Sequence, residues 1–65
     1  MNILINDTPR ELPTGASLAD AIALLAPAPP FAAAVNKQFV PRSGYAARTL
    51  QDDDLVEVIR PVTGG

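Results

Sequence analysis

Neither cysteine nor histidine occurs in this chain of 65 residues, and their absence limits the ways in which it can fold. A domain this short buries only about 60% of the surface that its unfolded chain exposes, so its hydrophobic core is marginal. Small domains commonly compensate with disulfides or a structural metal ion, and this chain lacks the residues that usually provide either. We therefore expect a single domain, residues 1–65, that depends on packing and a compact sheet.

The composition indicates a globular protein with no nucleic-acid or membrane partner. Apolar residues make up 48% of the chain and charged residues 18%, unlike the composition of disordered segments. The net charge is −2, and no basic stripe accompanies the three aromatic residues, which argues against nucleic-acid binding. No apolar run is long enough to span a bilayer, and we find no secretory signal, so we expect a cytoplasmic location.

The residue types also argue against an independent enzyme. Without histidine and cysteine, the commonest general base and the best thiol nucleophile are missing. The four glycines form neither a phosphate-binding loop nor a dinucleotide fingerprint. Residues 51–54 are the most acidic stretch, but adjacent aspartates point in different directions, so we interpret them as a solvated turn. We expect no catalytic residue, no bound cofactor and no metal site.

Turn residues and prolines divide the chain into short elements. Ser17 and Asp20 have the spacing of a capping box and predict the start of a helix, which Pro27 ends. The apolar segments on either side of this helix are short and bounded by turn residues, as strands are. We expect a helix over residues 18–26 and strands at residues 1–5, 10–12, 31–35, 38–40 and 55–59.

This order of elements predicts a two-layer α+β domain in which a mixed five-stranded sheet packs on one main helix. A right-handed crossover would join the first strand to the strand after the helix. In the last strand, Leu55 and Ile59 are our choice for the face that the helix covers. The opposite face then offers a candidate partner surface formed by Val40, Val56, Val58 and Arg60.

The chain finishes with Val62-Thr63-Gly64-Gly65, and two interpretations of this sequence remain open. Chain ends are often disordered, so the glycines can be incidental. Alternatively, residues 60–65 form a flexible extended tail, with a reach of about 20 Å, that carries a bare carboxylate into another protein. At neutral pH that carboxylate is an anion, and a partner that uses ATP must activate it before a sulfur nucleophile can attack.

Residues 36–42 have the pattern Asn-x-x-x-Val-Pro-Arg, which is the most specific feature of the chain when it is combined with the tail and the chain length. The other characteristic segments are residues 1–7, Ala34-Val35, Tyr45, the acidic turn before Leu55, and residues 62–65. Together these segments resemble the ThiS family of sulfur carriers in thiamine thiazole biosynthesis, which have a β-grasp (ubiquitin-like) fold. The resemblance covers essentially the whole chain.

The resemblance implies a function for the tail. A ThiF-like adenylyltransferase would adenylate Gly65 with ATP, and a cysteine desulfurase or another sulfur donor would supply the sulfur of a thiocarboxylate. A ThiG-like thiazole synthase would then accept that sulfur. Gly64 would allow passage into the partners' channels, and Val62 and Thr63 would lie in the groove.

The chain departs from the family pattern at two positions. Asp53 stands where glycine is common in the acidic turn, and Tyr45 stands where tryptophan is common. Three other functions remain open beside the resemblance. They are a MoaD-like sulfur carrier for molybdopterin or another pathway, a ubiquitin-like modifier, and a β-grasp binding module in which the terminal glycines are incidental.

Overall fold

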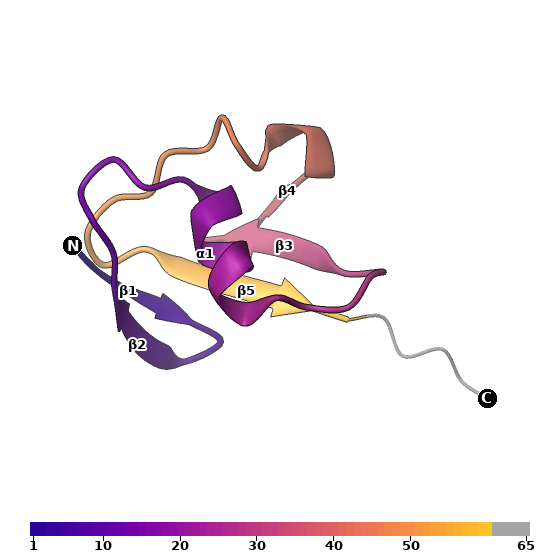
Figure 1. The fold of residues 1–65 in the computed structure, drawn as a ribbon, viewed down its shortest axis with the longest axis horizontal. Coiled ribbons are helices and arrows are strands. Elements are labelled where there is room, and N and C mark those ends of the chain that lie inside the picture. The colour runs from indigo at the N-terminus through magenta and orange to yellow at the C-terminus, as the bar shows by residue number, and fades with distance from the viewer. Residues whose placement is uncertain (61–65) are drawn as a thin grey trace.

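The computed structural model describes residues 1–60, and the fold is a mixed five-stranded sheet with one α-helix across one face (Figure 1). The strand order is β2-β1-β5-β3-β4, and the one parallel pair among these strands is β1 with β5. The α+β prediction is therefore confirmed for residues 1–60. The elements are β1 (Asn2–Ile5), β2 (Thr8–Glu11), α1 (Leu18–Leu25), β3 (Ala32–Val35), β4 (Gln38–Val40), η1 (Arg42–Gly44) and β5 (Leu55–Ile59).

The helix begins where the sequence predicts. The Asp20 backbone N–H donates to the Ser17 hydroxyl at 3.3 Å, and the Ser17 backbone N–H donates to the Asp20 carboxylate at 2.9 Å. This reciprocal pair is the predicted capping box. The helix ends at Leu25, because Ala26 adopts a left-handed conformation (φ 45°) and Pro27 cannot continue the hydrogen-bond pattern.

Two tight turns form the hairpins. Asn6-Asp7 joins β1 to β2, and Asn36-Lys37 joins β3 to β4. The four φ angles are 49°, 68°, 51° and 70° in that order. Positive φ at both central residues is the signature of a type I′ turn, whose twist matches that of the flanking strands.

Strand β2 begins earlier than the predicted 10–12 segment and includes a proline. Pro9 lies opposite Leu4 on an edge strand of the sheet. Because Ile5 and Thr8 flank the two-residue turn as a hydrogen-bonded pair, the next pair is not hydrogen-bonded. The missing N–H of Pro9 therefore disrupts no bond within the sheet.

The predicted core face of β5 is wrong. Val56 is fully buried, whereas Ile59 is 55% exposed. Val56 lies opposite Ile5 of β1 and Val35 of β3, which are also fully buried beneath α1. Apolar residues lie on both faces of β5, so the sequence of the strand is compatible with burial of either face. The buried neighbours Ile5 and Val35 decide which face α1 covers.

The predicted crossover between the first strand and the strand after the helix is also wrong. Strand β5 lies between β1 and β3, so β1 has its parallel partner in β5. Strand β3 runs antiparallel to β5. The last strand thus occupies the centre of the sheet, where both its edges are hydrogen-bonded.

Candidate functional site

The structure places the origin of the C-terminal segment at the centre of the sheet. Strand β5 ends at Ile59, which lies opposite Ala32 of β3, and Arg60 follows as an exposed residue. The predicted site residues Val62, Thr63, Gly64 and Gly65 lie outside the described residues. Strand β5 is the described element that precedes these residues in the chain.

A turn asparagine completes the hydrogen bonding of β5 near its end. Beyond Ile5, β1 no longer pairs with β5, and Asn6 takes the next position. The Asn6 backbone N–H donates to the carbonyl of Val56 at 2.9 Å. The Val58 backbone N–H donates to Asn6 Oδ1 at 2.9 Å, and Asn6 Nδ2 donates to the Val58 carbonyl at 3.3 Å. The carboxamide therefore acts as an additional peptide group beside β5.

The second turn asparagine holds the start of β5. The Leu55 backbone N–H donates to Asn36 Oδ1 at 2.9 Å, and Asn36 Nδ2 donates to the Asp54 carboxylate at 2.9 Å. The other carboxylate oxygen of Asp54 accepts the Gln51 backbone N–H at 2.8 Å. Asp54 is the buried charged residue of the described chain, and these partners satisfy both its oxygens.

The acidic stretch forms a turn in which each aspartate has a separate role. Asp52 accepts a hydrogen bond from the Asn2 backbone N–H at 2.6 Å, whereas Asp54 bonds the residues named above. Asp53 adopts a φ of 69°, the glycine-like conformation expected at this position. No group of three or more acidic side chains within residues 1–60 could hold a metal ion.

The predicted partner surface needs correction. Val40 and Val56 are buried on the side covered by α1, and Val58 is half-buried against the same core. Arg60 alone of the predicted set is exposed. The outer face of the sheet instead presents Leu4, Phe39 and Ile59, which are 38%, 69% and 55% exposed.

A salt bridge lies on the same outer face. Lys37 Nζ is 3.4 Å from a carboxylate oxygen of Glu57. Lys37 belongs to the β3–β4 turn, and Glu57 belongs to β5, opposite Ala34. Because the lysine side chain is 76% exposed, this pair contributes little to stability.

A mixed sheet that wraps one helix, with its first and last strands parallel at the centre, defines the β-grasp class. Within that class, the chain belongs to the ThiS family, whose model matches residues 3–65. The match extends through the C-terminal residues that the structure does not describe.

Two solved structures have a similar fold. Both are of the thiamine biosynthesis protein ThiS from Geobacter metallireducens. Its crystal structure has a TM-score of 0.82 at 23% identity, with complete coverage of both chains. Its NMR solution structure has a TM-score of 0.73 at 25% identity and covers 100% of this chain and 88% of that chain. No curated protein sequence matches the chain.

The sequence did not lead us to predict that Asn6 and Asn36 position strand β5. A signal was present, since asparagine occupies the first position of both two-residue turns. Turn propensity explains asparagine there without any further role, because it tolerates positive φ. Only the folded sheet shows that both carboxamides bond the same strand.

Proposed function

We propose that this chain is a sulfur carrier in thiamine biosynthesis and that the Gly65 carboxylate is the group that carries the sulfur. The observation that supports this proposal most strongly is the ThiS family match, which runs to Gly65. The two structural neighbours are thiamine biosynthesis proteins with the same fold. The hydrogen bonds to β5 support it further, because they hold the strand from which residues 61–65 continue.

In the proposed reaction, an adenylyltransferase of the ThiF type joins the Gly65 carboxylate to the AMP part of ATP, and pyrophosphate leaves. The carbonyl carbon of Gly65 then becomes an electrophile, and glycine places no side chain beside it. A persulfide sulfur attacks this carbon, the bond to AMP breaks, and AMP takes the electron pair. A second thiol then cleaves the sulfur–sulfur bond, which releases the thiocarboxylate and forms a disulfide.

The partners in this proposal divide the chemistry among them. The adenylyltransferase binds ATP, a cysteine desulfurase or another donor supplies the persulfide, and a ThiG-like thiazole synthase accepts the sulfur. The carrier acts as a co-substrate of these enzymes. Residues 60–65 would form an extended tail. Within it, Val62, Thr63 and Gly64 would occupy the narrow channel that leads to each active site.

Mass spectrometry of the intact protein tests the proposal. The chain is incubated with ATP, the cognate adenylyltransferase and a persulfide donor, and we expect the mass increase for replacement of one oxygen by sulfur at Gly65. A chain that lacks Gly65 and a reaction without ATP are the controls. If the complete reaction leaves the mass unchanged, the sulfur-carrier function is wrong. Transfer to thiazole synthase is measured separately, as thiazole formed from the isolated thiocarboxylate.

A further inference from the structure

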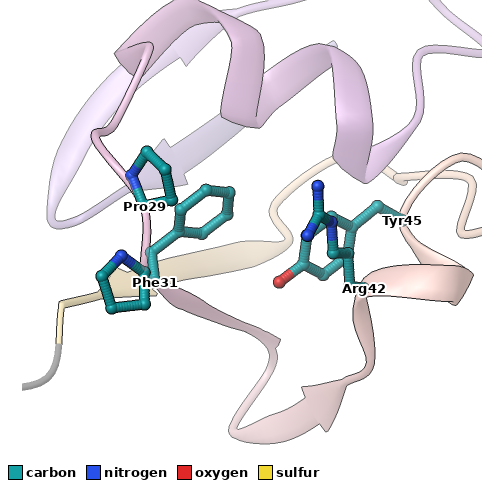
Figure 2. A pocket seen from close by; sticks show the side chains of 5 residues that line it. Pro29, Phe31, Arg42 and Tyr45 are labelled. Atoms are coloured by element: carbon teal, nitrogen blue, oxygen red, sulfur yellow. The ribbon is translucent and has the colours of Figure 1, made fainter.

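A pocket of about 310 Å³ lies between the segment before β3 and the η1 turn. Figure 2 shows Pro29 and Phe31 on one side of this pocket, with Arg42 and Tyr45 on the other. The rings of Phe31 and Tyr45 are stacked, with centroids 6.1 Å apart and an interplanar angle of 18°. Both rings pack against the core, so the apolar walls of the pocket are anchored. Pro30 completes the lining.

Arg42 gives this apolar pocket a positive charge. Arg42 is exposed, and none of the acidic residues within the described range 1–60 lines the pocket. Within residues 1–60 there is one salt bridge, between Lys37 and Glu57. No carboxylate of these residues therefore lies within salt-bridge distance of Arg42. A guanidinium beside stacked aromatic rings suits a carboxylate that is carried next to an apolar group. This pocket therefore has the chemistry to accept an aspartate or glutamate from another protein.

The pocket lies at the same end of the sheet as the last residue of β5. Ala33 lies opposite both Val40 and Val58, and β3 is antiparallel to β4 and β5. Strands β4 and β5 therefore run in the same direction, and Arg42 and Arg60 each follow two residues after one of these valines. Strand β3 lies between β4 and β5, and neighbouring strands are about 4.8 Å apart. The ends of β4 and β5 are therefore about 10 Å apart. An enzyme that receives the tail can therefore cover the pocket as well.

We propose that the pocket is a docking site for an acidic segment of the adenylyltransferase. In this arrangement, the partner's carboxylate bonds the Arg42 guanidinium, and the apolar side chain next to it lies between Pro29 and the Phe31 ring. The inference rests on the proposed function, since it assigns the contact to the enzyme that activates Gly65. It adds a second point of attachment, away from the tail.

Isothermal titration calorimetry with the purified cognate adenylyltransferase tests this docking site. We expect Arg42→Ala to raise the Kd about tenfold or more, because hydrogen bonds between charged groups contribute about 1.5–3 kcal/mol. Arg42→Glu should raise it further through like-charge repulsion. The matched controls are Arg10→Ala and Arg10→Glu, on β2 at the opposite edge of the sheet, which should leave the Kd near the wild-type value. Thermal unfolding checks that every variant folds.

A second arm separates a partner carboxylate from the carboxylate at Gly65. The full chain is prepared with Gly65 as a carboxamide, with and without Arg42→Ala. If the pocket binds the enzyme, Arg42→Ala weakens the carboxamide form by the same factor as the natural form. If the effect disappears in the carboxamide form, Arg42 acts through the chain's own carboxylate and the docking site is wrong.

The outcomes distinguish the two proposals. If wild-type chain gains the thiocarboxylate while Arg42→Ala and Arg42→Glu bind the enzyme as tightly as wild type, the docking site is wrong and the carrier function stands. If the wild-type chain never gains the thiocarboxylate, the proposed function is wrong and the docking site falls with it. NMR amide shifts at Phe31 and at residues 42–45 on addition of the enzyme provide an independent readout. Their absence also contradicts the inference.

Discussion

The carboxamide of Asn6 hydrogen-bonds both backbone groups of Val58, so a single side chain continues the pairing of β5 beyond the last residue of β1. Val58 lies two residues before Arg60, where the described chain ends. The end of β5 is therefore held by β3 along one edge and by Asn6 along the other. This arrangement holds the last residues of β5 on both sides.

Replacement of Asn6 by alanine should lower the free energy of unfolding by about 1–3 kcal/mol, because it removes two hydrogen bonds and leaves alanine at positive φ. Urea denaturation measures the change. Asn6→Gly separates the two causes, since glycine adopts this φ freely but has no carboxamide. We expect Asn6→Gly to lie between wild type and alanine. Equal stability of the alanine variant and wild type would show that the carboxamide bonds contribute nothing.

Replacement of Val56 by alanine tests which face of β5 belongs to the core. Val56 is fully buried, so we expect a loss of about 2 kcal/mol from lost burial and an unfilled cavity. Ile59→Ala is the matched control on the same strand, where the side chain is 55% exposed and its truncation should cost about 0.5 kcal/mol. Chemical denaturation of both variants gives the comparison. A larger loss at Ile59 would restore the face expected from sequence.

Asp53→Gly should stabilise the acidic turn. Asp53 has a φ of 69°, which costs a residue with a Cβ more than it costs glycine. The gain is partly offset by the greater freedom of glycine in the unfolded chain, so we expect a net increase of about 0.5 kcal/mol. Asp52→Gly, which loses the hydrogen bond from the Asn2 backbone, should instead destabilise the protein. The midpoints of thermal unfolding of the two variants should move in opposite directions.

Gly64→Val should slow thiocarboxylate formation about tenfold or more. A branched side chain restricts the backbone and widens the segment that must enter the partner's channel, and small displacements of a reacting group have large effects on rate. The rate is followed by intact-protein mass spectrometry with ATP, the adenylyltransferase and the sulfur donor. Thr63→Val is the comparison within the same segment, because it replaces a hydroxyl by a methyl group without adding bulk and should slow thiocarboxylate formation less than Gly64→Val. Conversion of the Gly64 variant at the wild-type rate would contradict passage through a narrow channel.

Local sequence patterns predicted the elements closely. The Ser17–Asp20 capping box, the asparagine turns and the prolines act within a few residues, so their effects can be recognised without knowing the rest of the fold. The resemblance carried by residues 36–42 and the tail led to the family that the comparison found. Assignments of this kind depend on short-range hydrogen bonds and backbone preferences.

The tertiary structure decided the features that depend on which strands become neighbours. Alternation in β5 marks two faces but cannot choose between them, and the choice followed from Ile5 and Val35 on either side of Val56. The pocket at Arg42 depends on the same kind of information, because Phe31 and Tyr45 meet only after the chain folds. Sequence alone therefore determined the elements and the family, whereas long-range strand pairing determined the core face, the support of β5 and the pocket. The physical reason is that side-chain burial depends on residues that are distant in the chain.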